Sequence, residues 1–207
     1  MGRKEEILYA ALELAAENGI KGVSMSLIAE KVGIKAPSLY NHFKSKDEIV
    51  REMYGFLRDR ALAGGGPAPL DLSKLSDMSV EEILLDSVSA YMGIVSDRDM
   101  LTLFKVLYSE RGTNPVAAQI LVEETERMLR SSRNMFYALV VHGKVKNDDI
   151  DTAAMTYSLT IHSLIDYRMD MLTAGMIREF GEEGSAVPLS IRDFIRWFSH
   201  QIGVNNE

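Results

Sequence analysis

The segment from residue 24 to residue 48, SMSLIAEKVGIKAPSLYNHFKSKDE, constrains the fold most, because it reads as two short helices joined by a tight turn. Apolar residues repeat at helical spacing over residues 28–32. Gly33 can adopt the positive φ that ends the first helix. Pro37 suits the first turn of the second helix, where its missing N–H costs nothing. A second helix of about eight residues is not stable alone in water, so we expect a helical scaffold that presents it.

The second helix of this pair has an apolar inner face and a polar outer face. Leu39 and Phe43, four residues apart, form the inner stripe. The residues left to point outward are Ser38, Tyr40, Asn41 and His42. Lysines lie near both ends of the helix, namely Lys35, Lys44 and Lys46. This mixture suits hydrogen bonding to base edges and phosphates in a major groove, although the spacing alone fits an ordinary helical hairpin with a solvated face equally well.

The motif itself is more specific than its periodicity. The run I-A-x-x-x-G-I, followed by P-S-L-Y-N-H-F-K-S-K-D-E-I, resembles the DNA-binding domain of the tetracycline-repressor (TetR) family of bacterial regulators. The resemblance covers roughly the first quarter of the chain, and its most specific part is L-Y-x-H-F-x-x-K after a glycine turn. In that family the helix bearing this run lies in the major groove.

The resemblance implies a set of DNA-contacting residues. They are Ser24, Met25, Ser26, Lys35, Ala36, Pro37, Ser38, Tyr40, Asn41, His42 and Lys46. Residues 36–38 would enter the groove. Tyr40 and His42 would contact phosphates with Asn41 between them, and Lys46 would hold the DNA backbone from the following helix.

The helix before the turn contributes the other members of this set. The resemblance implies that Ser24 caps that helix and that Met25 and Ser26 approach the DNA. Two positions depart from the family pattern. Lys35 stands where the family often has a small hydroxyl residue, and Ala36 cannot form a hydrogen bond with a base. We therefore expect few direct base contacts.

Composition indicates a globular protein without cysteine chemistry. The 207 residues are 46% hydrophobic and 26% charged, which is typical of soluble domains. Because there are no cysteines, disulfides, thiolate catalysis and Cys-ligated zinc are excluded. No apolar run reaches the length of a membrane span, and the N-terminal residues predict an amphipathic helix rather than a signal peptide. We expect a cytoplasmic protein with no membrane partner, and the family resemblance implies a bacterial one.

The net charge of −7 argues against a nucleic-acid partner until its distribution is considered. Residues 1–60 contain ten Lys or Arg and nine Asp or Glu, whereas the remainder contains 13 and 21. The acidity therefore lies almost entirely in the second part of the chain. A nearly neutral DNA-binding part depends on local lysines, and its DNA complexes are expected to dissociate readily with salt.

Helical patterns continue on both sides of a glycine-rich break. One helix is expected over residues 3–18, and a capping box of Ser45 with Glu48 starts another that runs to about Ala63. The run GGGPAPL at 64–70 predicts a linker, because a phosphate-binding loop would require a following G-K-[ST] that is absent. We expect a three-helix DNA-binding domain with helix-turn-helix in 1–63 and a helical ligand-binding and dimerisation domain in 71–207.

The second part predicts helices alone. A Ser79–Glu82 capping box and an Asn114–Pro115 start mark two of them, and no convincing strand run occurs. The whole chain is therefore expected to be all-α, with about nine helices.

Residues after 70 also suggest a ligand cavity. Nine of the twelve methionines lie there, and methionines with aromatic residues suit an adaptable apolar pocket. The candidate ligand-binding residues are Tyr91, Phe104, Tyr108, Met128, Met135, Tyr157, His162 and Arg168. The alternative is that the apolar members fill a helical core and that the two polar ones are satisfied by core partners such as Asp166 or Asp170.

The last two long helices have apolar faces broad enough to serve two surfaces. We expect residues of about 150–175 and 190–202 to form a homodimer, as the corresponding helices do in the family. Trp197 lies off the main stripe, and aromatic residues are enriched at interfaces. A groove-binding helix also gains most when it is doubled on a two-fold operator.

No enzymatic motif competes with this interpretation. The sequence lacks H-E-x-x-H spacing, a G-x-S-x-G elbow, a Walker loop and a dinucleotide fingerprint. We expect a DNA-binding transcriptional regulator, a repressor released from double-stranded operator DNA by a small, mostly apolar molecule, with no cofactor. The alternative is a helical partner-binding or small-molecule-binding module, or an enzyme, without DNA affinity.

Overall fold

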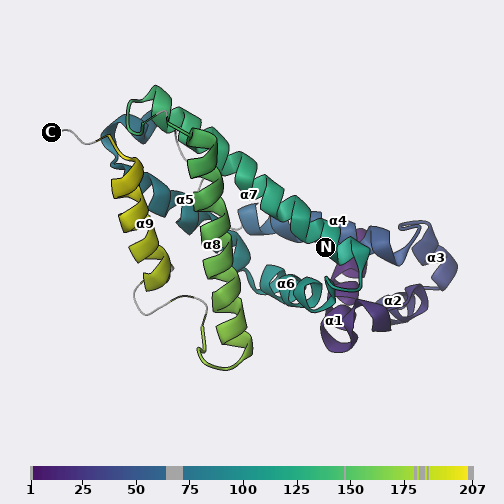
Figure 1. The fold of residues 1–207 in the computed structure, drawn as a ribbon. Helices are drawn as coiled ribbons and strands as arrows, with labels where there is room; N and C mark the ends of the chain where they lie inside the picture. The colour runs from purple at the N-terminus through teal and green to yellow at the C-terminus, as the bar shows by residue number, and fades with distance from the viewer. Residues whose placement is uncertain are drawn as a thin grey trace. The chain divides into compact units, whose positions relative to one another are not determined.

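A computed structural model describes residues 2–63, 72–146, 148–179, 181, 185 and 187–204. Within these residues the chain forms nine α-helices and one short 3₁₀ helix (Figure 1), and an isolated bridge pairs Val145 with Gly203. The expected all-α class is confirmed. The predicted linker at 64–70 lies outside the described residues.

The first helix extends to Gly22, four residues beyond its expected end, across an interruption at Gly19. In chain order the helices are α1 Arg3–Gly22, α2 Met25–Val32, α3 Ala36–Tyr40, α4 Lys46–Ala63, the 3₁₀ helix η1 Leu72–Asp77, α5 Val80–Val95, α6 Arg98–Glu110, α7 Pro115–Val141, α8 Ile150–Thr173 and α9 Leu189–Ile202. Among the described residues, no helix is both long and apolar enough to cross a membrane.

Local capping explains where several helices begin and end. The hydroxyl of Ser24 accepts the N–H of Leu27 at 3.2 Å at the start of α2, as expected. Gly33 ends α2 in the left-handed conformation, with φ 72°. The Ser79–Glu82 capping box is present at α5, and the side-chain oxygen of Asn114 accepts two backbone N–H groups at the start of α7.

The chain divides into two compact units. The first unit comprises Met1–Gly64 and Ile94–Glu123, and the second comprises Gly65–Gly93 and Glu124–Glu207. The N-terminal helices therefore share a unit with α6 and the first part of α7, segments that a division into 1–63 and 71–207 assigns to the other side. That functional division remains a proposal.

The first unit has a continuous apolar core to which α1, α2, α3, α4 and α6 all contribute. Its side chains are at most 4% exposed and include Ile7, Leu8, Ala11, Leu12, Ile28, Leu39, Phe43, Ile49, Met53, Leu57, Met100, Leu103 and Leu107. Full burial of one large apolar side chain contributes about 1.5–3 kcal/mol. This packing holds α3, which is too short to persist alone.

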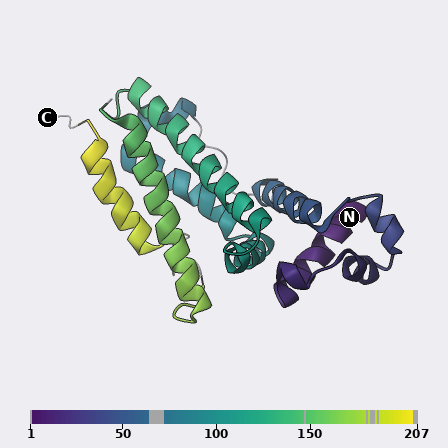
Figure 2. The same cartoon turned by 45° about the vertical axis from the view of Figure 1, so that its right-hand side comes forward.

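The second unit buries its own core between α5, α7, α8 and α9. Both views show α8 and α9 side by side (Figures 1 and 2). Its core side chains include Ile83, Leu84, Phe136, Leu139, Tyr157, Ile161, Ile191, Ile195 and Phe198. The rings of Phe136, Tyr157 and Phe198 lie within 6.2 Å of one another, a separation typical of favourable aromatic pairs.

Candidate nucleic-acid interface

The turn between α2 and α3 is built by backbone hydrogen bonds around Gly33. The N–H of Ile34 donates to the carbonyl of Ala29 at 2.9 Å, and Lys35 leads in extended conformation into α3, which has proline in its first turn. Helix α3 contains five residues, fewer than the eight expected. Asn41 and His42 continue it as a turn, in which His42 donates its N–H to the carbonyl of Leu39 at 2.9 Å.

Burial along α3 separates its two faces as expected. Leu39 and Phe43 are 0% and 1% exposed, and both lie in the core. Ser38, Tyr40 and Asn41 are exposed, with Tyr40 at 53%, and His42 is half-buried. A hydroxyl, a phenol and an amide are therefore available to a partner, on a segment whose backbone is fixed from beneath.

The other predicted DNA-contacting residues lie on the same helix-turn-helix. Ser26, Lys35 and Pro37 are exposed, whereas Met25 and Ala36 are half-buried. Ser24 is exposed and already serves as the cap of α2. Position and exposure are thus compatible with DNA contact for most of the predicted DNA-contacting residues. They are least compatible for Met25 and Ala36, whose apolar side chains are half-buried.

Lys46 makes a structural contact that the sequence did not indicate. Its half-buried side chain donates from Nζ to the carbonyl of Ile20 at 2.8 Å, which ties the start of α4 to the end of α1. A lysine ammonium has three donors, so two remain for a phosphate. Replacing Lys46 must therefore affect the packing of the helix-turn-helix as well as any DNA contact.

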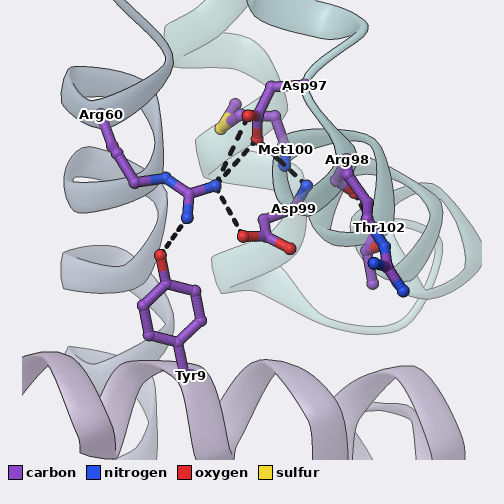
Figure 3. Close-up of polar contacts among 7 residues, drawn as sticks. All are labelled: Tyr9, Arg60, Asp97, Arg98, Asp99, Met100 and Thr102. Atoms are coloured by element: carbon purple, nitrogen blue, oxygen red, sulfur yellow. Dashed lines mark hydrogen bonds and ion pairs between the residues drawn. The ribbon is translucent and has the colours of Figure 1, made fainter. Parts of the chain in front are cut away.

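A polar cluster around Arg60 joins three helices of the first unit, as Figure 3 shows. The guanidinium near the end of α4 donates to Asp99 at 2.6 Å and to Asp97 at 3.2 Å, and also to the hydroxyl of Tyr9 on α1. The Asp97 carboxylate caps α6 by accepting the N–H groups of Asp99 and Met100. This cluster fastens the start of α6 to the helices that support α3.

The cluster also changes the acid–base properties of its members. Burial is the largest influence on Arg60 and lowers its pKa, but the hydrogen bond to Asp99 and the neighbouring charges outweigh burial and raise that pKa overall. Burial raises the pKa of Tyr9, although the nearby guanidinium of Arg60 opposes this change. Both side chains therefore keep their protons at any physiological pH.

The eight candidate ligand-binding residues do not fall in one unit. Phe104 and Tyr108 belong to the first unit, where their rings lie 6.4 Å apart, and the other six belong to the second. Tyr157 donates its hydroxyl to the carbonyl of Leu84 at 3.0 Å, and burial raises its pKa. Arg168 donates to the carbonyl of Gly181 at 2.7 Å.

The remaining candidates differ in their surroundings. His162 lies 3.7 Å from the Asp166 carboxylate, Met135 is buried, and Tyr91 and Met128 are half-buried. The partners of Tyr157 and Arg168 favour structural roles for those two residues. A shallow hollow of about 170 Å³ lies elsewhere in the second unit, lined by Leu129, Arg133, Asp151, Thr152, Ala154 and Met155. Among the described residues, no group of three or more His, Asp or Glu is arranged to hold a metal ion.

Exposed apolar side chains gather on the last two long helices. On α8 they are Met155, Leu159 and Tyr167, at 42–60% exposure, and on α9 Leu189 and Trp197 are 52% and 58% exposed. Both helices also bury a full apolar face in the core. The two-sided character predicted from the sequence is therefore present on the described residues.

Comparison with known proteins matches both parts of the chain to regulators. The family described as "Bacterial regulatory proteins, tetR family" matches residues 7–53, and the family described as "AefR-like transcriptional repressor, C-terminal domain" matches residues 82–179. The first match contains the whole of the α2–α3 segment and the start of α4.

Curated relatives at 30% identity or more match only part of this chain. The HTH-type transcriptional repressor KstR2 of Mycolicibacterium smegmatis is 42% identical over 57 residues, which are 28% of this chain and 26% of that protein. The tetracycline repressor protein class D of Escherichia coli is 32% identical over 101 residues, 45% of this chain and 46% of that protein. The chain thus spans less than half the length of these curated relatives.

Solved structures resemble the chain over nearly its full length. Salmonella enterica GusR superposes with a TM-score of 0.66 at 22% sequence identity, covering 96% of this chain and 93% of that one. At this identity the likeness concerns the fold alone.

Proposed function

Because the chain belongs to the TetR family of bacterial regulatory proteins, we propose that it is a transcriptional repressor that binds double-stranded operator DNA and responds to a small molecule. The observation that carries the proposal is the division of α3 into a buried Leu39–Phe43 stripe and an exposed face with Ser38, Tyr40 and Asn41. A core-anchored short helix with polar side chains free on its outer face is suited to a major groove. A regulator of this kind acts in the bacterial cytoplasm.

The residues of this segment divide into two proposed roles. Ser38 and Asn41 are the candidates for base contact, since a hydroxyl or an amide can pair with base edges. Tyr40, His42 and Lys46 are the candidates for phosphate contact, which fixes register without reading sequence. The half-buried positions Met25 and Ala36 line the surface without a polar group to offer.

A homodimer is the proposed assembly. Support comes from the exposed apolar side chains of α8 and α9, including Leu159 and Trp197. Burying them against a second copy would remove apolar surface from water, and a two-fold dimer would present two copies of α3 to a palindromic operator. The dimer interface proposed here uses residues of about 150–175 and 190–202.

The effector is proposed to be small and mostly apolar, and to bind among residues 80–175. Support comes from the second matched family, a repressor C-terminal domain, and from the methionine and aromatic side chains in this region. Binding that favours a conformation with low operator affinity would release the DNA. Operator DNA must then weaken effector binding by the same factor.

The experiment that tests DNA binding is a titration of the purified protein into a fluorescent DNA fragment from upstream of its own gene. A fragment of the same length and composition with scrambled sequence is the control. We expect the upstream fragment to bind at least a hundredfold more tightly than the scrambled one in 150 mM salt. Equal affinity for both fragments would reject the proposed sequence-specific regulator.

A further inference from the structure

The last residue of α6, Glu110, carries a buried carboxylate to which the proposed function gives no role. The residue is 9% exposed, and its Oε1 accepts the backbone N–H of Lys21 at 3.3 Å. Its Oε2 is also buried and has no hydrogen-bond partner among the described residues. Burying a carboxylate with so few partners is costly, so its retention at this place calls for a specific reason.

The backbone of α1 is shaped to receive this carboxylate. Helix α1 is interrupted at Gly19, whose φ of 68° lies in the left-handed region. A Cβ atom at position 19 would lie only 2.7 Å from Oε1 of Glu110. The backbone conformation favours glycine here, and a larger residue would also displace the carboxylate of Glu110.

Glu110 and Lys46 hold the same peptide group from two different helices. Lys46 of α4 donates to the carbonyl of Ile20, and Glu110 of α6 accepts the N–H of Lys21. This carbonyl and this N–H belong to the one peptide unit that links the two residues. The peptide unit is therefore held at its carbonyl from α4 and at its N–H from α6.

This peptide unit lies in residues 19–24, here called the connection, which comprise the end of α1 beyond the interruption at Gly19 and the two residues before α2. Ile20 is 1% exposed, and Ser24 at the end of the connection caps α2. The two contacts from α4 and α6 therefore hold the chain shortly before it enters α2. The backbone carbonyl of Glu110 also accepts the N–H groups of Thr113 and Asn114, so the same residue stabilises the turn from α6 to α7.

We propose that Glu110 is a positioning residue for the helix-turn-helix. Through its contact with the Ile20–Lys21 peptide, Glu110 makes the position of the start of α2 depend on the position of the end of α6. The inference rests on the proposed function, since it concerns the surface proposed to contact DNA. The Glu110 contact is to Lys21 at the end of α1, shortly before α2, whereas the Arg60 cluster at the other end of α6 joins Tyr9 of α1 and Arg60 of α4.

Three variants of the full-length protein separate reach from charge. Glu110→Gln keeps the length of the side chain and an oxygen acceptor but removes the charge. Glu110→Asp keeps the charge but withdraws the carboxylate by about 1.5 Å. Glu110→Ala removes both, and Ser109→Ala, at the exposed neighbouring position, is the control. Each protein is measured for hydrogen exchange at the Lys21 amide by NMR, for melting temperature, and for affinity to the upstream and scrambled DNA fragments.

If Glu110 positions the connection through the length of its side chain, the variants fall into two pairs. In Glu110→Asp and Glu110→Ala, exchange at the Lys21 amide rises about tenfold, and the ratio of operator affinity to scrambled-DNA affinity falls about tenfold. In Glu110→Gln and in the control, both quantities stay within about threefold of the unmodified protein. Affinities are measured at least 20 °C below each melting temperature, so that global unfolding contributes nothing.

Several results would overturn the proposal. If Glu110→Asp matches the unmodified protein in DNA affinity and in hydrogen exchange at the Lys21 amide, the length of the side chain is unimportant. Glu110→Gln that loses as much as Glu110→Ala would assign the effect to charge, and a change in only one of the two measurements would break the link between the contact and DNA binding. If the unmodified protein binds no upstream fragment, the proposed function is wrong, and the exchange data still decide whether Glu110 holds the connection.

Discussion

Replacing Arg60 by methionine should destabilise the first unit while leaving its apolar packing nearly intact. Methionine retains much of the aliphatic stem beside Tyr9 but removes the guanidinium that joins Asp97 and Asp99. The two carboxylates would then face each other without a cation, at side-chain exposures of 28% and 27%. The start of α6 would lose its tie to α1 and α4.

The magnitude follows from the exposure of the groups. A hydrogen bond to a charged group contributes about 1.5–3 kcal/mol, and an exposed ion pair contributes about 0.2–1 kcal/mol. Because the Arg60 side chain is 38% exposed, a value of about 1 kcal/mol for each carboxylate contact is appropriate, which gives a loss of about 2 kcal/mol. For a chain of this size, that loss lowers the melting temperature by about 4–8 °C.

The assay is thermal unfolding followed by circular dichroism, with Arg98→Met as the matched control. Arg98 lies between the two aspartates in sequence, and in Figure 3 its side chain points away from Arg60. The control removes the same charge from an exposed site and should change stability by less than about 0.5 kcal/mol. In 1 M salt the difference between Arg60→Met and the unmodified protein should shrink, because ion pairs this exposed are screened.

Equal melting temperatures for Arg60→Met and Arg98→Met would refute this reasoning. A loss of the same size in both variants would indicate a general effect of net charge. A double-mutant cycle with Asp99→Asn adds a second criterion, since a coupling energy near zero would show that the 2.6 Å contact contributes nothing in solution.

Further predictions concern the DNA contacts, the dimer and acid stability. Lys46→Ala should weaken binding to all DNA sequences and flatten the dependence of DNA affinity on salt by about one unit of slope. It should also lower the melting temperature, because the hydrogen bond from Lys46 to Ile20 is lost. Lys44→Ala should affect DNA binding alone. Trp197→Asp should give monomer or aggregate in light scattering, and a stable monomer for the unmodified protein would reject the dimer. Hydrogen bonds from the backbone N–H and the hydroxyl of Ser79 lower the pKa of Glu82. The contribution of Glu82 to stability is therefore complete above its ordinary pKa of 4.5, and it is lost as the pH falls through the lower pKa of the folded state. Glu82→Gln should reduce the acid dependence of unfolding.

Features that depend on neighbours in sequence could be predicted. The Leu39–Phe43 stripe, the Ser24 cap and the Asn114 start of α7 each involve residues at most four apart, where spacing alone determines which side chains meet. The α3 helix was the exception, since it ends at Tyr40 and continues as a turn. A segment this short owes its conformation to packing rather than to helix propensity.

Features that depend on distant residues could not be predicted. Arg60 meets Asp97 and Tyr9 across 37 and 51 residues, and Glu110 meets Lys21 across 89. No local pattern distinguishes these side chains from ordinary surface charges. The same limit applies to the candidate ligand-binding set, where aromatic and methionine content did not separate Phe104 in the first unit from Tyr157 in the core of the second.

The exposed face of α3 carries the proposed DNA binding, and one comparison tests that face most directly. A Tyr40→Ala, Asn41→Ala double variant changes two exposed side chains and leaves Leu39 and Phe43 in place. We predict that its melting temperature stays within about 2 °C of the unmodified protein, since surface substitutions change stability little. Its affinity for the upstream fragment should fall at least tenfold, because a lost base contact alone costs about 1–3 kcal/mol. Unchanged affinity of the double variant for that fragment would contradict the assignment of α3 as the DNA-binding helix.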